Sequence, residues 1–171
     1  MTPLGIYVHI PFCASKCPYC DFYSLRQGED AWENYTNCII KRIKSYQEQV
    51  LPVDTVYFGG GTPSWYGARR IQELLSALSK LFQVEKDAEI TVEANPDSVD
   101  LRALRRLRKA GVNRLSLGMQ SASDAELQHI GRVHTMEQVT AAVEAARKAR
   151  ESIRRKTALG GAAMPDKLRD C

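Results

Sequence analysis

The sequence lacks any long run of apolar residues, so it offers no segment that would cross a bilayer. A transmembrane helix needs about 20 consecutive, mostly apolar residues, and no stretch of the 171 residues approaches that length. Residues 1–5 also lack a basic stretch followed by an apolar one, which is the pattern of a secretory signal. These absences predict a cytoplasmic protein without a membrane span.

A basic surface is missing from most of the chain, although the formal net charge is +4. Eight basic and three acidic residues fall within 147–171, which leaves 16 basic and 17 acidic residues elsewhere. Nucleic-acid binding needs basic side chains gathered on a folded face. Because the excess charge lies at one end of the chain, the sequence predicts no nucleic-acid partner.

Cysteine is scarce, yet three of the five cysteines fall close together as Cys13-x3-Cys17-x2-Cys20. An odd total with one tight group favours metal ligation over a disulfide framework. Thiolates are the usual ligands of iron–sulfur clusters, and three of them can hold three irons of a cubane while one iron stays open. A zinc-stabilised binding module and inert buried cysteines are the alternatives. Zinc usually takes four protein ligands, and neither His9 nor Cys38 lies at a familiar spacing for the fourth.

Short β-rich segments alternate with longer segments of helical periodicity, which predicts an α/β fold with parallel strands and right-handed crossovers. Cys38 falls on the first helix beside Ile39 and is predicted to be a core thiol. We expect strands at 6–10, 55–58, 89–93 and 114–117, and helices at 31–49, 71–82, 101–111, 123–130 and 136–147.

The alternating pattern stops after Ala149. Residues 150–156 show no convincing apolar face, and residues 160–165 have no strand character. We therefore predict one folded unit over 1–149. The basic tail over 150–171 is expected to be poorly ordered, with at most one helical turn.

Each unusual motif directly follows a predicted strand, and ligands of parallel α/β folds bind at the carboxyl ends of strands. The motifs are therefore expected to meet at one site. They are the cysteine segment, Gly59-Gly60-Gly61-Thr62-Pro63, Glu93-Ala94-Asn95-Pro96 and Gly118-Met119-Gln120-Ser121.

Each motif has a plain structural interpretation beside the functional one. The glycine run would let the backbone approach a ligand, or it would simply turn the chain. Glu93 would bind sugar hydroxyls, or it would be a solvated strand end. Gln120 and Arg132 would bind amide-like or carboxylate groups, although a surface salt bridge would also explain Arg132. His134 would cap or solvate nearby backbone.

The motifs together resemble the radical S-adenosylmethionine (SAM) family, in the group that contains oxygen-independent coproporphyrinogen III oxidase and a related haem chaperone. The resemblance runs from Gly5 to Ala149 with matching order and spacing. It is carried by residues 6–13, 16–22, 56–64, 93–96, 113–121 and 131–134.

The resemblance implies a partial (βα) barrel in which Cys13, Cys17 and Cys20 ligate a [4Fe–4S] cluster and SAM takes the open iron. The family reaction is one-electron reduction of SAM to methionine and a 5′-deoxyadenosyl radical, and the cofactors supply that chemistry. By motif position, the residues expected to contact SAM are Tyr7, Tyr19, Gly60, Gly61, Thr62, Glu93, Gln120 and Arg132.

The residues after Cys20 distinguish two branches of the group. The decarboxylating oxidases usually carry a further cysteine two residues on, where this sequence has Phe22. The resemblance therefore implies the haem chaperone branch, with haem or porphyrin, an electron donor and a haem-accepting protein as partners. The alternative is oxidation of coproporphyrinogen III to protoporphyrinogen IX.

The sequence departs from the family pattern at Arg150, where the family continues into a further strand bearing an aspartate that helps bind SAM. From this break we expect a chain truncated, or shifted in reading frame, near Ala149 after about four βα units. Such a fragment is expected to keep the cluster ligands and to show weak or no SAM turnover.

Overall fold

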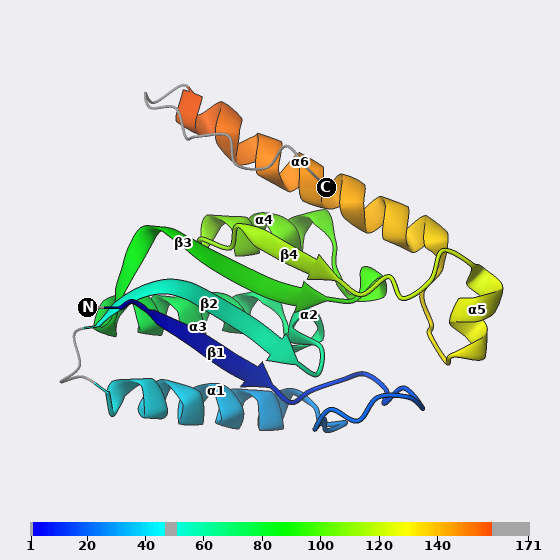
Figure 1. The fold of residues 1–171 in the computed structure, drawn as a ribbon, viewed down its shortest axis with the longest axis horizontal. Helices are drawn as coiled ribbons and strands as arrows, with labels where there is room; N and C mark the ends of the chain where they lie inside the picture. The colour runs from blue at the N-terminus through cyan, green and yellow to red at the C-terminus, as the bar shows by residue number, and fades with distance from the viewer. Residues whose placement is uncertain (1, 47–50, 159–171) are drawn as a thin grey trace.

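The computed structural model describes residues 2–46 and 51–158 (Figure 1). Four parallel strands form one sheet in the order β1-β2-β3-β4. Because all four run in the same direction, their carboxyl ends lie along one edge of the sheet (Figure 1). The strands are β1 (Leu4–Ile10), β2 (Pro52–Gly60), β3 (Gln83–Ala94) and β4 (Arg114–Leu117).

The longer helices pack against one another in chain order, α1 on α3, α3 on α4 and α4 on α6. They cover one face of the sheet, and α5 lies beyond the carboxyl ends of the strands (Figure 1). The helical segments are α1 (Glu29–Lys44), α2 (Pro63–Tyr66), α3 (Ala68–Leu81), the 3₁₀ helix η1 (Pro96–Ser98), α4 (Leu101–Lys109), α5 (Asp124–His129) and α6 (Met136–Ala158).

Alternation along the strands decides which side chains enter the core, because successive strand residues point to opposite faces. Val56, Phe58 and Val92 are fully buried and belong to the hydrophobic core formed with α3. The intervening residues Tyr57 and Glu93 are only half-buried. The core therefore lies on the helix side of the sheet, and the opposite face presents polar and aromatic side chains.

An aromatic cluster anchors the chain where β1 runs into the cysteine segment. The Phe12 ring stacks on Tyr66 at a centroid distance of 5.6 Å and meets Trp32 at 6.1 Å. The buried Arg70 guanidinium lies over both Trp32 and Tyr66 and pairs with Glu29. This packing ties α1 and α3 to the residue that precedes Cys13.

The parallel direction of the strands predicted from the sequence is confirmed, with β3 beginning earlier than expected at Gln83. The prediction that helical structure nearly stops after Ala149 is wrong, since α6 continues to Ala158. No glycine or proline interrupts 150–158, and its arginines and lysine favour helix without needing an apolar face. The rest of the predicted tail, 159–171, and the last part of the helix expected over 31–49 lie outside the described residues.

Cys38 is exposed, so its prediction as a core thiol is also wrong. The buried face of α1 carries Trp32, Thr36 and Ile43. Cys38 follows Thr36 by two positions, which places it about 200° around the helix, on the opposite side. In the described parts of the chain, no helix is both long enough and apolar enough to span a membrane.

Burial of Tyr66 predicts a loss of stability in alkali. Burial raises the pKa of its phenol to about 12, whereas the unfolded phenol ionises near pH 10. Above about pH 10 the unfolded chain releases this proton and the folded chain retains it. The free energy of unfolding should therefore fall by up to about 1.4 kcal/mol per pH unit between the two pKa values.

Urea unfolding between pH 8 and pH 11.5 measures this effect. Tyr66→Phe should be less stable at pH 8, because Thr36 loses its hydrogen-bond partner. Its stability should then decline less steeply with pH than that of the wild type. Parallel pH profiles for the two proteins would contradict this account of Tyr66.

Candidate functional site

The motifs that follow the strands meet at one edge of the sheet, as the sequence predicts. The backbone N–H of Gly61 donates to the Ile10 carbonyl at 2.8 Å, which joins the end of β2 to that of β1. The N–H of Gly118 donates to the Ala94 carbonyl at 2.8 Å, which joins the segment after β4 to the end of β3. The four strand ends therefore form one continuous surface.

The cysteine segment is a loop whose two ends are held together. Leu25 N–H donates to Pro11 O at 2.7 Å, and Cys13 N–H donates to Leu25 O at 3.2 Å. Inside the loop, Cys20 N–H donates to Cys17 O at 3.0 Å and forms a tight turn. These bonds confine the three cysteines to one short, closed segment beside the end of β2.

The three thiols are free and partly exposed. Within the described residues, no three Cys, His, Asp or Glu side chains are gathered closely enough to hold a metal ion. Cys13 Sγ instead lies 3.4 Å from Thr62 Oγ1. The donor set still fits an iron–sulfur cluster chemically, because it offers three thiols in one closed loop. Binding would require these side chains to turn toward a common centre.

The glycine run packs directly against the cysteine loop. A Cβ added to Gly61 would lie 2.7 Å from Phe12 O and 2.9 Å from Ile10 O, so no side chain fits there. Gly60 has a φ of +108°, and a Cβ there would lie 2.5 Å from the His9 ring. The glycines therefore allow the ends of β1 and β2 to pack closely together. The sequence suggested only a ligand contact or a simple turn for them.

Glu93 is held at two points and is not a freely solvated strand end. Its Oε1 accepts a hydrogen bond from Tyr57 Oη at 2.7 Å, and its Oε2 accepts one from Gly60 N–H at 3.1 Å. The ring of Tyr7 stacks on that of Tyr57, with centroids 6.0 Å apart and planes at 26°. The end of β3 therefore presents a fixed carboxylate beside two tyrosine rings.

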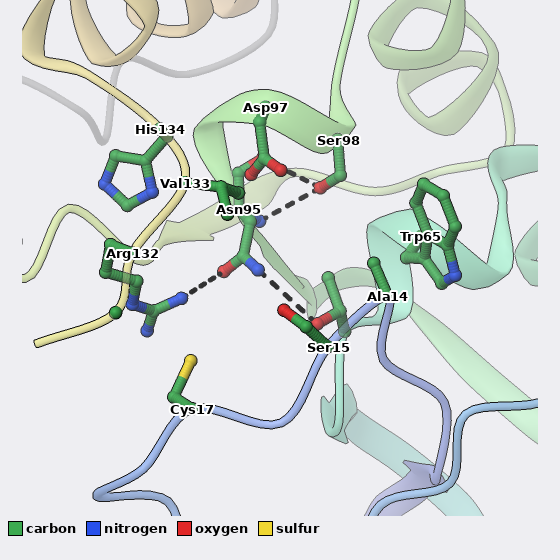
Figure 2. Close-up of a pocket in the computed structure, with 12 residues that line it drawn as sticks. Ala14, Ser15, Cys17, Trp65, Asn95, Asp97, Ser98, Arg132, Val133 and His134 are labelled. Carbon is green, nitrogen blue, oxygen red and sulfur yellow. Dashed lines mark hydrogen bonds between the residues drawn. The ribbon is translucent and has the colours of Figure 1, made fainter. Parts of the chain in front are cut away.

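A chain of side-chain contacts runs across the site from Cys13 to Tyr19, and Figure 2 shows its central link between Asn95 and Arg132. Thr62 Oγ1, next to Cys13 Sγ, accepts from Asn95 Nδ2 at 3.5 Å. Asn95 Oδ1 accepts from Arg132 Nη1 at 3.2 Å, and Arg132 Nε donates to Tyr19 Oη at 2.6 Å. Arg132 thus bonds an amide and a phenol, rather than forming the salt bridge considered from the sequence.

Asn95 was not singled out as a site residue by sequence reasoning, although it lies two positions after Glu93 in the same motif. Asn95 is the residue that precedes η1, and the turn of the backbone there brings its side chain to the centre of the contact chain. The pocket in Figure 2 surrounds it with residues from four segments that are distant in sequence, among them Ser15, Cys17, Trp65 and Arg132.

Gln120 joins the site from the segment after β4. Its φ of 67° is left-handed, which is uncommon for a residue with a side chain and costs free energy. A Cβ added to Gly118 would lie 3.1 Å from Gln120 Nε2 and 3.2 Å from Asn95 Oδ1, so the two amides approach each other over that glycine. His134 is buried, and its Nε2 lies 3.0 Å from Met119 O, so it serves as a partner for backbone.

Comparison with known proteins identifies the family. A model of the radical SAM superfamily matches residues 7–161. The chain belongs to the radical SAM superfamily. The radical SAM family uses a [4Fe–4S] cluster and SAM, which matches the cofactors that the sequence resemblance implied.

Curated relatives and a solved structure agree with this assignment. The chain is 39% identical over 137 residues to the heme chaperone HemW of Escherichia coli K12, covering 78% of this chain and 36% of that protein. It is 36% identical over 154 residues to the Haemophilus influenzae HemW, covering 86% and 40%. The structure of E. coli coproporphyrinogen III oxidase, HemN, matches with a TM-score of 0.79 at 31% identity, covering 85% and 34%. The chain thus spans two fifths or less of the length of these relatives.

The contact at Gly61 predicts a large effect of a single methyl group. Gly61→Ala would push against backbone atoms of the cysteine loop, which cannot move aside as a side chain could. We expect a loss of about 2–3 kcal/mol in the free energy of unfolding, measured by urea denaturation.

Gly5→Ala is the matched control, because, among the described residues other than its two chain neighbours, an added Cβ there would come within 4 Å of Thr55 Cβ alone, at 4.0 Å. This variant should change stability by less than about 0.5 kcal/mol. Equal stabilities for the two variants would show that the close packing at Gly61 is not required.

Proposed function

We propose that this chain holds a [4Fe–4S] cluster on Cys13, Cys17 and Cys20 and binds SAM across the adjacent strand ends. The observation that carries the proposal is the closed cysteine loop, whose Phe12 carbonyl accepts from Thr62 N–H at 2.7 Å. This bond holds the start of the loop, with Cys13, beside the glycine run. Residues proposed to contact SAM, all at or near the strand ends, are Tyr7, Tyr19, Gly60, Gly61, Thr62, Glu93, Gln120 and Arg132.

When bound, the cluster would supply the one-electron reduction for which the family is named, and the protein would bind and orient SAM. The backbone N–H groups of Gly60, Gly61 and Thr62 are already engaged with Glu93, Ile10 and Phe12. Because these N–H groups are in use, this segment would bind the cationic amine of SAM by accepting hydrogen bonds from it with its oxygen atoms.

Arg132 would bind a carboxylate of SAM. Its Nε and Nη1 bond to Tyr19 and Asn95, and a guanidinium has five N–H donors in all. Donors therefore remain for an anionic group, while the two existing bonds fix the direction of the side chain. The pKa of Tyr19 is raised, chiefly by burial, so its phenol stays neutral at physiological pH.

We further propose that the protein binds haem or a porphyrin and acts as a haem chaperone in the cytoplasm, with an electron donor and a haem-accepting protein as partners. The curated HemW relatives support this branch, as does Phe22 after the third cysteine. Phe22 is 67% exposed and Tyr23 is 66% exposed. Exposed aromatic rings beside the cysteine loop offer stacking surface to a planar macrocycle.

The alternative function is oxidative decarboxylation of coproporphyrinogen III to protoporphyrinogen IX. The observation that favours it is the match to the HemN structure over 85% of this chain. The exposed aromatic rings beside the cysteine loop would serve a porphyrinogen substrate as well as haem.

Replacement of single cysteines tests the cluster proposal. After anaerobic reconstitution with iron and sulfide, the wild type should hold about four irons per chain. Cys13→Ala, Cys17→Ala and Cys20→Ala should each lose most of this iron, because two thiolates cannot retain the cubane. Cys38→Ala is the control and should keep it, since Cys38 lies on the exposed face of α1. Zinc in place of iron in the wild type would support the zinc-stabilised module and contradict the proposal.

Haem titration, run beside a coproporphyrinogen decarboxylation assay, separates the two functions. The chaperone proposal predicts saturable haem binding by absorption spectroscopy at about one haem per chain, without decarboxylation. Phe22→Ala should weaken haem binding severalfold, because the loss of a stacked ring removes on the order of 1 kcal/mol. Decarboxylation without haem binding would establish the alternative instead.

A further inference from the structure

The carboxylate of Glu93 is held by Tyr57, a side chain that was not among the residues expected to contact SAM. Tyr57 lies two residues before Gly59 on β2, on the face of the sheet opposite the core. Its Oη donates to Glu93 Oε1 at 2.7 Å, while Gly60 N–H donates to Oε2 at 3.1 Å. Each oxygen of the carboxylate therefore receives one hydrogen bond from the protein.

The two bonds leave one acceptor position free on each oxygen. An ionised carboxylate has about four lone-pair sites, of which the tyrosine and the glycine use two. Because both oxygens are pinned, the free positions point in fixed directions. Two adjacent hydroxyl groups, such as those of a ribose ring, match this pair of acceptors.

The missing side chain at Gly59 makes the arrangement possible. A Cβ there would lie 2.8 Å from Tyr57 Cε1 and 3.0 Å from Glu93 Oε2, so any larger residue would separate the tyrosine from the carboxylate. Tyr7 closes the other side of Tyr57 by stacking on its ring. The Tyr57 ring is thus held between the backbone of Gly59 and the ring of Tyr7.

The protonation state of Tyr57 suits a donor. Its hydrogen bond to Glu93 is the largest cause of a raised pKa, followed by burial. The phenol therefore stays neutral throughout the physiological pH range, and its proton remains available to the carboxylate.

We infer that Tyr57 is a positioning residue that orients the Glu93 carboxylate to accept the two hydroxyls of a ribose, and so selects ribonucleosides over deoxyribonucleosides. Because that ribose belongs to SAM, the inference rests on the proposed function. Tyr57 acts through Glu93 and need not touch SAM itself.

Equilibrium binding of SAM and of its 2′-deoxy analogue to the reconstituted protein tests the inference. The wild type should bind SAM about tenfold more tightly than the analogue, as expected for a site that hydrogen-bonds the missing hydroxyl. Tyr57→Phe keeps the ring and its stacking but removes the donor. It should weaken SAM binding about tenfold and reduce the preference for SAM over the analogue to less than about threefold.

Tyr46→Phe is the matched control, since it removes a phenol hydroxyl just after α1 and should leave both affinities unchanged. Iron content and far-ultraviolet circular dichroism report whether each variant folds. Glu93→Ala provides a second route to the same answer. If Tyr57 acts through this carboxylate, adding Tyr57→Phe to Glu93→Ala should change SAM affinity less than about twofold.

Unchanged affinity in Tyr57→Phe, equal weakening for SAM and analogue, or a further large loss in the double variant would each overturn the role of Tyr57. If the wild type binds no SAM, the proposed function itself fails, and the inference falls with it. The wild-type titration therefore distinguishes the two failures.

Discussion

The site depends on the direct backbone contact between the glycine run and the start of the cysteine loop. Gly61 and Thr62 donate to the carbonyls of Ile10 and Phe12 at 2.8 and 2.7 Å. A single added methyl at Gly61 would lie within 3 Å of both carbonyl oxygens and of Phe12 N. Because the end of β2 is fixed on the end of β1 in this way, the thiols, the carboxylate and the pocket all have defined positions relative to one another.

Hydrogen bonds extend this constraint to the other strand ends. Asn95 lies 82 positions after Cys13 in the sequence, yet only the Thr62 hydroxyl separates their side chains. Arg132 then returns from the segment between α5 and α6 to Tyr19 inside the cysteine loop. Short polar contacts therefore connect the strand ends to the loop, which suits the proposed binding of two cofactors side by side.

The sequence was sufficient to predict the parts of the fold that depend on local pattern. Strand and helix periodicity predicts the parallel sheet, which the structure confirms, while the metal site expected from the spacing of Cys13, Cys17 and Cys20 stays a prediction. The sequence also indicates Glu93 as a candidate binding residue, because ligands in such folds bind at the carboxyl ends of strands. The partners of Glu93 could not be predicted, since the bond from Tyr57 depends on register between β2 and β3 and on the empty space at Gly59.

Two errors have a similar physical origin. Cys38 was assigned to the core from its neighbour Ile39, but a helix turns by about 100° per residue, so neighbours in sequence face different directions. The continuation of α6 past Ala149 was missed because the prediction required an apolar face, whereas residues 150–158 contain no glycine or proline and favour helix without one. In the first case, the direction in which the side chain leaves the helix decided its exposure. In the second case, the helix preference of the residues was left out of the prediction.

We propose that three thiols on the loop hold a cluster within reach of SAM at the strand ends. The most direct measurement is the electron paramagnetic resonance spectrum of the anaerobically reconstituted and reduced protein, recorded with and without SAM. The reduced protein should give the signal of a [4Fe–4S] cluster, and the shape of this signal should change when SAM is added. A protein that gives no such signal, or one whose spectrum SAM leaves unchanged, would contradict the proposal.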